Sequence, residues 1–185
     1  MRRLLDVIFS ALGLVILLPL LIVLFLVGLI DTRSPLFLQE RVGRDQKPFL
    51  LLKFRTMCPG TKSMASHLTD ASNITTFGSF LRRTKLDELP QLWNVMRGEM
   101  SLVGPRPCLF NQEELIANRT DLGVFNARPG ITGLAQIQGI DMSTPELLAK
   151  IDFKMLETLS LSNYFRYIFL TLLGKGFGDR VRLDI

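Results

Sequence analysis

The first apolar segment of the chain is long and uninterrupted. No residue from Val7 to Ile30 is charged, and most of the side chains are Leu, Ile, Val or Phe. Because a helix needs about 20 apolar residues to cross a bilayer, this run predicts a membrane segment within residues 1–32. A cleaved signal peptide fits poorly, since its apolar part is shorter and ends at a small-residue cleavage site, which does not follow Ile30.

The charges around this segment leave two membrane topologies open. Basic residues precede it, at Arg2 and Arg3, and also follow it, at Arg33, Arg41 and Arg44. The preference of basic residues for the cytoplasm therefore applies to both ends. Pro19 removes one helical hydrogen bond in the middle of the run and favours a kink there. A re-entrant helix that enters and leaves through one leaflet satisfies both features, and an ordinary spanning helix is the alternative.

The remaining pattern predicts a small α+β domain over residues 33–185. Two apolar runs around the turn-like stretch GRDQKP predict a short β-hairpin whose second strand is Phe49–Phe54. The polar stretch Cys58–Ser72 is typical of a loop, and FGSFLRRTKLDEL predicts a short helix or turn. EELIANR is weakly helical, and RPGITGLAQIQG predicts a loop with a short strand.

A last amphipathic pattern lies near the C-terminus. Five apolar residues recur there at helical spacing, namely Leu161, Phe165, Ile168, Phe169 and Leu172. Tyr164 and Tyr167 add aromatic side chains of the kind that is favoured at a membrane–water boundary. We favour an interfacial helix beside the N-terminal segment, and a helix that packs on a protein core is the alternative.

Composition narrows the chemistry. The net charge of +5 and the pI near 9.6 suit anionic lipid head groups and phosphorylated substrates in a membrane protein, and no nucleic-acid motif accompanies them. His67 is the only histidine, and Cys58 and Cys108 stand outside any C-x-x-C pattern. These residues argue against zinc clusters and His-dependent triads.

Candidate chemistry concentrates in the stretch TKLDELPQLWNVMRGEMSLVGPRP. Pro90 is best tolerated at the start of a helix and Gly98 is typical of a helix end, so Asp87 and Glu88 are expected just before a short helix. In the alternative, Asp87 caps a helix that begins at Thr84, which would place Pro90 inside that helix at a cost of about 3 kcal/mol. Local physical chemistry leaves capping and catalysis equally open.

Two adjacent carboxylates repel each other unless a cation stands nearby. A Mg²⁺ ion, or Mn²⁺, would balance Asp87 and Glu88, because Mg²⁺ commonly binds one or two carboxylates together with substrate phosphates. Basic residues suited to phosphate flank the pair, namely Arg82, Arg83, Lys85, Arg106 and Arg128. The alternative for each of them is a solvated surface charge.

The same stretch resembles the bacterial sugar transferase family, the monotopic phosphoglycosyl transferases. The resemblance covers nearly the whole chain, through the oily start with its proline, QERVGRDQKPFLLLKFRTM, TTFGSFLRRTKLDELPQLWNVMRGEMSLVGPRP and ARPGITGLAQIQG. The size resembles that of minimal members with a single catalytic domain.

This resemblance implies transfer of a sugar 1-phosphate from a UDP-sugar to undecaprenyl phosphate, with release of UMP, as the first membrane step of bacterial glycoconjugate assembly. It implies that Asp87 is a nucleophile that becomes phosphoglycosylated, that Glu88 helps to hold Mg²⁺, and that the membrane helix is re-entrant with its break at Pro19. Residues 33–185 would face the cytoplasm from the bacterial inner membrane. UDP-sugar, undecaprenyl phosphate and membrane lipids are the expected partners, and a homodimer is left open.

The chain departs from the family pattern at three positions. Leu18 stands before the proline where many members have serine, Ile140 follows AQIQG where many have arginine, and Asn163 stands where aspartate is frequent. These differences leave the reaction intact but put local phosphate and sugar contacts in doubt. The sequence does not name the sugar, although the minimal architecture favours an N-acetylated amino-deoxy sugar, and a catalytically silent membrane scaffold is the rival function.

Overall fold

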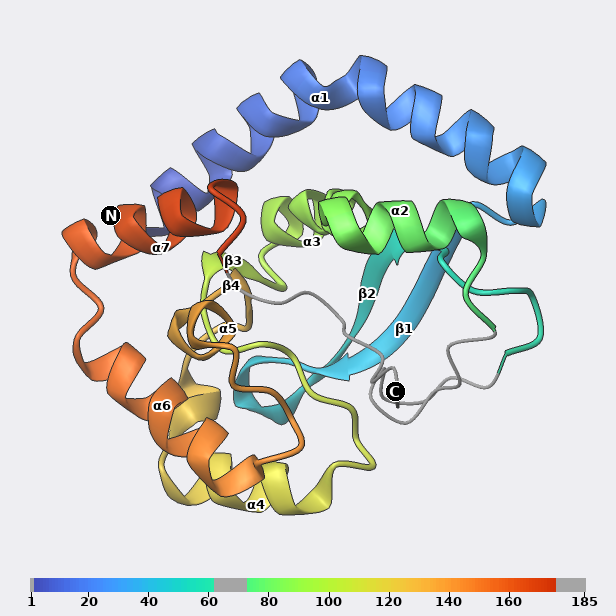
Figure 1. Ribbon diagram of the computed structural model, residues 1–185. Helices are drawn as coiled ribbons and strands as arrows, with labels where there is room; N and C mark the ends of the chain where they lie inside the picture. Colours follow the sequence, from blue (N-terminus) through green and yellow to red (C-terminus); the bar gives the residue numbers. More distant parts are fainter. Residues whose placement is uncertain (1, 62–72, 176–185) are drawn as a thin grey trace.

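A computed structural model of the chain describes residues 2–61 and 73–175. Its α-helices are α1 (Arg2–Thr32), α2 (Thr76–Thr84), α3 (Gln91–Arg97), α4 (Glu113–Asp121), α5 (Leu134–Gln138), α6 (Pro145–Glu157) and α7 (Leu161–Leu172). Its strands are β1 (Leu36–Val42), β2 (Pro48–Phe54), β3 (Ser101–Val103) and β4 (Gly130–Thr132) (Figure 1). This mixture confirms the predicted α+β class. The loop predicted over Cys58–Ser72, which includes His67, lies outside the described residues from position 62 onward.

Helix α1 contains the whole apolar segment. By length and composition it could cross a membrane. A stretch of 18 successive residues within it has a mean hydropathy of 3.2, and 11% of this stretch is buried inside the protein. Figure 1 shows the helix arching over the rest of the chain, and Pro19 lies inside it, where the missing N–H weakens the helical ladder. A long apolar helix with so much exposed surface indicates membrane association, and its re-entrant topology stays a prediction.

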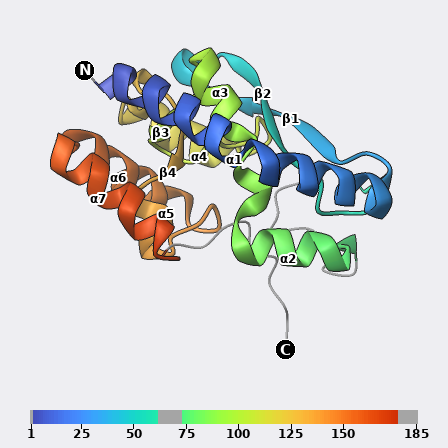
Figure 2. The same cartoon turned by 90° about the horizontal axis from the view of Figure 1, so that it is seen from above.

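Small residues let α1 approach the domain closely. A Cβ atom added to Gly13 would lie 3.1 Å from Leu92 Cδ1, and one added to Gly28 would lie 2.8 Å from Pro35 Cβ. Leu24 is buried on the same side of the helix. Seen from above, α1 crosses the domain diagonally, with α3 and the β1–β2 hairpin on one side and α2 and α7 on the other (Figure 2).

The predicted hairpin is confirmed. Strands β1 and β2 pair antiparallel, in the register that places Leu36 opposite Phe54. Alternate residues of β2 face the core, where Leu51 packs with Val95 of α3 and with Met100. The hairpin therefore buries one face against the helix that follows the acidic pair.

A second, parallel strand pair forms beneath α3. Ser101 of β3 lies opposite Gly130 of β4. The backbones of the two segments come so close that a Cβ added to Gly130 would lie 2.5 Å from Gly104 Cα, so glycine is required for this approach. The short strand predicted in RPGITGLAQIQG is confirmed as β4, but helix α5 forms where the remainder was expected to be a loop.

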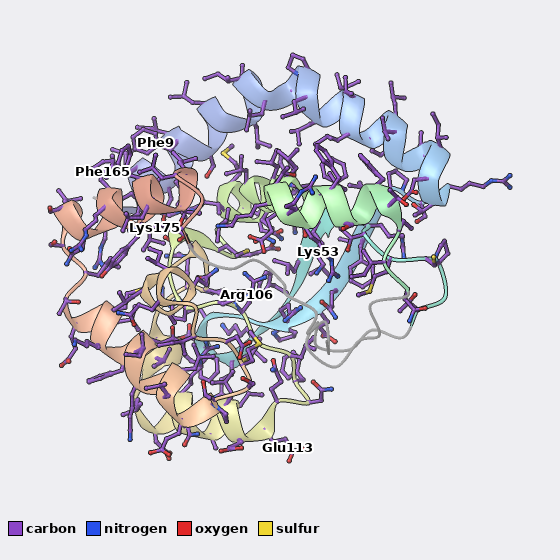
Figure 3. The ribbon with its side chains drawn as sticks, in the orientation of Figure 1. Phe9, Lys53, Arg106, Glu113, Phe165 and Lys175 are labelled. Atoms are coloured by element: carbon purple, nitrogen blue, oxygen red, sulfur yellow. The ribbon has the colours of Figure 1, made fainter. Side chains whose placement is uncertain are left out.

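Helix α7 exposes apolar side chains as predicted, but its tyrosines face inward. Phe165 is 45% exposed and packs edge-on against Phe9 of α1, with 5.9 Å between ring centroids (Figure 3). Tyr164 and Tyr167 are buried, so the expectation that they lie at a membrane–water boundary is wrong. The physical reason is that both rings fill the core beside β3, where they pack with Val103.

One buried carboxylate ties α1 to the domain. Asp6 is 3% exposed and accepts hydrogen bonds from the Ser101 hydroxyl (2.9 Å), the Leu102 N–H (3.0 Å) and the Tyr164 hydroxyl (2.8 Å). Burial raises the pKa of Tyr164, and Asp6 raises it further, so this hydroxyl stays protonated and remains a donor. The Asp6 contacts join α1, β3 and α7.

Arg3 adds a second link from α1 to the domain. Its Nη1 donates to the Val95 carbonyl at 2.7 Å, and its Nη2 donates to the Met96 carbonyl at 3.0 Å. Carbonyls in the last turn of a helix lack α-helical donors and carry partial negative charge. The guanidinium group of Arg3 therefore stabilises the C-terminal end of α3.

Candidate active site

The paired carboxylates lie in a single 3₁₀ turn between two helices. Helix α2 ends at Thr84, Lys85 follows in the left-handed region with a φ of 59°, and the turn η4 (Leu86–Glu88) leads into α3. Because Thr84 ends a helix rather than beginning one, the alternative in which Asp87 caps a helix starting at Thr84 is wrong.

Pro90 and Gly98 bound helix α3 as the sequence predicts. Pro90 immediately precedes the first residue of the helix with a φ of −61°, and Gly98 ends it with a φ of 87°. The latter conformation favours glycine, which has no Cβ to clash with the backbone. The acidic pair is therefore held just before a short helix, as expected.

Asp87 and Glu88 are both buried, at 3% and 8% exposure. Burying a carboxylate is costly unless it is paired or hydrogen-bonded. Glu88 meets this requirement through Arg106, whose Nη2 donates to Glu88 Oε1 at 2.8 Å. Arg106 comes from the segment after β3 and lies near the middle of the molecule, below α2 and α3 (Figure 3). A residue 18 positions away thus completes the acidic turn.

Lys85 adds a second positive charge beside the pair. Partial burial lowers the pKa of Lys85 below its ordinary value of 10.5, Glu88 opposes this shift, and Arg106 adds to it. The charges of Glu88 and Arg106 therefore lie close enough to Lys85 to change its pKa. Two cations next to two carboxylates form a site that can accept the phosphates of a substrate.

Two buried arginines hold the backbone of the segment that carries Arg106. Arg119 is 1% exposed, and it donates from Nη1 to the Arg106 carbonyl at 2.9 Å and from Nη2 to Asp152 Oδ2 at 2.6 Å. Arg41 Nη1 donates to the Pro107 carbonyl at 3.0 Å. Hydrogen bonds at two successive carbonyls therefore fix the position from which the Arg106 side chain reaches Glu88.

The other predicted phosphate-binding arginines occupy different surroundings. Arg82 Nε donates to Thr56 Oγ1 at 2.9 Å, and Arg83 is exposed. Arg128 Nε donates to the Gly98 carbonyl at 2.8 Å, and the cavity that Arg128 lines includes neither member of the acidic pair. Phosphate binding by these three arginines stays a prediction.

The acidic pair can contribute to a divalent cation site but does not form a complete cage. Within residues 2–61 and 73–175, no group of three or more His, Cys, Asp or Glu side chains is placed to hold a metal ion. Asp87 and Glu88 offer oxygen ligands only, which suits Mg²⁺, an ion that usually keeps water or substrate phosphates among its ligands. Such a site would be completed by a diphosphate.

Sequence reasoning missed three buried charged residues that organise this region, Asp6, Arg119 and Asp152. A signal for Asp6 existed, because it is the last charged residue before the apolar run and a carboxylate at that position is costly unless it is hydrogen-bonded. Arg119 and Asp152 are 33 positions apart, and no local pattern connects them.

Comparisons with known proteins now give the family. A family model described as bacterial sugar transferase matches residues 1–175. The chain is 36% identical to the UDP-galactose-lipid carrier transferase of Erwinia amylovora, over 93% of the chain and 39% of the relative. It is also 36% identical to the UDP-glucose:undecaprenyl-phosphate glucose-1-phosphate transferase of Caulobacter vibrioides, over 92% of the chain and 68% of the relative.

A protein of the latter name from Klebsiella pneumoniae is 37% identical, over 95% of the chain and 40% of the relative. The chain thus spans about two fifths of the length of the Erwinia and Klebsiella relatives. Because the family model matches 175 successive positions and these relatives align with nearly all of the chain, the chain belongs to the bacterial sugar transferase family.

Proposed function

We propose that the chain transfers a sugar 1-phosphate from a UDP-sugar to undecaprenyl phosphate, releasing UMP, as the first membrane step in assembly of a bacterial glycoconjugate. The Caulobacter and Klebsiella relatives carry names for this type of reaction. The observation that carries the proposal is the buried pair of Asp87 and Glu88, with Arg106 bound to Glu88. A silent membrane scaffold would have no use for two adjacent buried carboxylates, which are costly to keep ionised.

The proposed reaction proceeds by two displacements at one phosphorus atom. A carboxylate oxygen of Asp87 attacks the phosphorus that carries the sugar, and the bond from that phosphorus to UMP breaks. An oxygen of the polyprenyl phosphate then attacks the same phosphorus and releases the Asp87 carboxylate. Covalent catalysis of this kind divides one difficult transfer into two easier steps and needs no histidine. Arg106 and Lys85 would balance the negative charge that develops during both.

Mg²⁺, or Mn²⁺, is the proposed cofactor. Glu88 would hold it together with Asp87, and the ion would neutralise charge on the diphosphate of the substrate. Arg106 limits the repulsion between the two carboxylates before substrate binds, because it already pairs with Glu88. The cluster of anions formed with substrate would otherwise be uncompensated.

We also propose that α1 is re-entrant and that residues 33–185 face the cytoplasm from the bacterial inner membrane. Basic residues at both ends of α1 support this orientation. The arch of α1 (Figure 1) and the exposed apolar side chains of α7, including Phe165 and Phe169, support contact of both helices with one membrane leaflet. Tags at the N-terminus and at the C-terminus should then both be cytoplasmic, and a periplasmic N-terminus would contradict the re-entrant topology.

The test is a single-turnover experiment with a panel of UDP-sugars, including UDP-glucose, UDP-galactose and UDP-N-acetylated amino sugars. Without acceptor, the correct donor should release up to about one UMP per active site and add the mass of a sugar phosphate to Asp87, and polyprenyl phosphate should discharge this adduct. Asp87→Asn should lower turnover at least ~10⁴-fold, or about 5.5 kcal/mol of transition-state stabilisation. The exposed acid Asp121 provides a matched control, since Asp121→Asn should keep parental turnover.

Four results would change the proposal. An adduct on another residue would assign the nucleophile to that residue. Asp87→Asn with more than a few per cent of parental activity and no adduct would favour direct attack by the acceptor phosphate. Full activity in excess chelator would remove the metal. Absence of turnover with every UDP-sugar would favour the scaffold.

A further inference from the structure

A cavity of about 470 Å³ lies where helix α1 begins. Its wall combines residues from the start of α1, from β3, from α6 and from the turn η5 (Val124–Asn126) with its flanking residues. Neither Asp87 nor Glu88 lines it. Four arginines do, namely Arg2, Arg3, Arg44 and Arg128. This concentration of positive charge on one cavity is not explained by the proposed reaction.

Three of these arginines keep unbalanced positive charge. Arg2, Arg3 and Arg128 donate to backbone carbonyl oxygens at distances between 2.7 and 3.4 Å. A carbonyl is neutral, so these hydrogen bonds hold the guanidinium groups in place without cancelling their charge. Each guanidinium carries five N–H donors, and these bonds use one or two of them. Arg44 differs, because it pairs with Asp45 at 3.5 Å on the exposed rim.

Asp6 does not cancel the surplus. It is the one carboxylate among the described residues that line the cavity, and a single negative charge cannot balance three guanidinium groups. Its oxygens also already accept from Ser101, Leu102 and Tyr164. The cavity therefore remains electropositive, in a partly enclosed place where a bound anion would be less screened than at an open surface.

The position of the cavity indicates which anions it can meet. Arg2 and Arg3 are the first described residues of α1, the helix apolar enough to enter a membrane, so the topology proposed above, on which this step rests, places the cavity at the level of lipid head groups. Phe153 and Leu156 of α6, with Leu159, give it an apolar wall. Arginines beside apolar surface at this level suit the phosphate of an amphiphile, which guanidinium groups bind through paired hydrogen bonds.

We propose that this cavity is a phosphate-ester site separate from the acidic pair. Its ligand is a phosphate group held by Arg2, Arg3 and Arg128, carried by either an anionic phospholipid or a soluble phosphate ester. Hydrogen bonds to the C-terminal end of α3 account for Arg3 and Arg128, but they do not explain why Arg2, which donates to the Leu159 carbonyl, lines the same cavity. The site would fix the start of α1 by binding a group that is present wherever the helix meets the membrane surface.

The test measures ligand binding to the purified full chain in detergent. Short-chain phosphatidylglycerol and phosphatidylcholine are compared by native mass spectrometry, and glycerol phosphate is added as a soluble competitor. Arg2→Gln/Arg128→Gln should weaken phosphatidylglycerol binding at least about tenfold, the loss expected for one charge-assisted hydrogen bond. Arg33→Gln/Arg166→Gln removes the same two charges from exposed positions outside the cavity and should bind as the parent does.

A second variant keeps every arginine in place. Asn126 lines the cavity, and Asn126→Asp adds a carboxylate there without changing the size of the side chain, so it should also weaken binding by several-fold with an unchanged melting temperature. If phosphatidylglycerol is preferred and glycerol phosphate does not compete with it, the ligand is a lipid head group. If glycerol phosphate does compete, the site accepts the phosphate of both the lipid and the soluble ester. Equal binding of both lipids, or cavity variants that bind as well as the Arg33/Arg166 control, would overturn the proposal. Arg3 and Arg128 would then serve only as caps of α3, and Arg2 only as a donor to the Leu159 carbonyl. UMP release plays no part in these measurements, so failure of the proposed reaction would not affect them.

Discussion

Replacement of Asp6 by alanine should destabilise the domain that follows α1, although Asp6 belongs to α1 itself. The change leaves the Leu102 N–H and the Tyr164 hydroxyl without the acceptor that they have in the structure. Tyr164 cannot escape by ionising, because burial, the larger cause of its raised pKa, remains in the variant, and Asp6→Ala would leave a buried, protonated hydroxyl. Ser101 can turn its own hydroxyl to another partner more easily, since its side chain is only partly buried.

The magnitude follows from these two donors. A buried donor without a partner costs about 1–3 kcal/mol, so Asp6→Ala should lower the free energy of unfolding by roughly 2–6 kcal/mol. For a chain of this size, 1 kcal/mol corresponds to about 2–4 °C in melting temperature, and the expected decrease is roughly 5–20 °C. Asp6→Asn keeps one acceptor oxygen and should lose about 1–2 kcal/mol, which gives a graded series.

Thermal unfolding in detergent, followed by circular dichroism, measures this loss. The control is Asp31→Ala on the same helix, because Asp31 also accepts a side-chain hydrogen bond, from Thr75 at 2.7 Å, but at an exposed position. A double-mutant cycle with Tyr164→Phe should give a coupling of about 1–2 kcal/mol. Additive effects in that cycle, or a melting temperature for Asp6→Ala equal to that of Asp31→Ala, would refute the reasoning.

Three further outcomes are expected. Arg106→Lys should lower UMP release at least about tenfold, because a point charge does not reproduce a guanidinium fork, and parental rates would make Arg106 a packing residue. Because the pKa of Lys85 is lowered, its ammonium group loses its proton at a lower pH than free lysine does, so kcat/KM should decrease at alkaline pH. Lys85→Arg should shift this decrease to higher pH, and an unshifted decrease would assign it to another group. Pro19→Leu should straighten α1 toward a spanning helix and move an N-terminal tag to the periplasm, and an unchanged tag position would show that neighbouring residues set the bend.

The turn that carries the acidic pair could be predicted from sequence because its determinants are local. Pro90 restricts where a helix begins and Gly98 permits the left-handed residue that ends it, so the bounds of α3 follow from residue types within ten positions of the pair. The β1–β2 hairpin follows in the same way from its two apolar runs and the turn-like stretch between them. These elements need no information from distant parts of the chain.

The partners of buried charges could not be predicted, because their contacts join distant segments. Tyr164 lies 158 positions after Asp6, and Asp152 lies 33 positions after Arg119. Hydrogen bonds between residues so far apart produce no periodic pattern in the sequence. Helix α7 shows the same limit. Its sequence has two aromatic stripes, and helical spacing alone does not tell which of them faces the core, so Tyr164 was expected at the membrane boundary.

The link from Arg3 to the end of α3 has a consequence for maturation of the newly made protein. Isolated helices shorter than about 12 residues are marginal in water, and α3 has seven residues. The hydrogen bonds from Arg3 therefore add to those of the Gly98 N–H in holding its last turn. Arg3 stands at the start of α1, which is synthesised first but docks only when the domain beneath it has formed. A newly made chain should therefore have a frayed last turn of α3 until α1 has docked, and the acidic pair, which precedes the other end of this short helix, would be held less firmly until then.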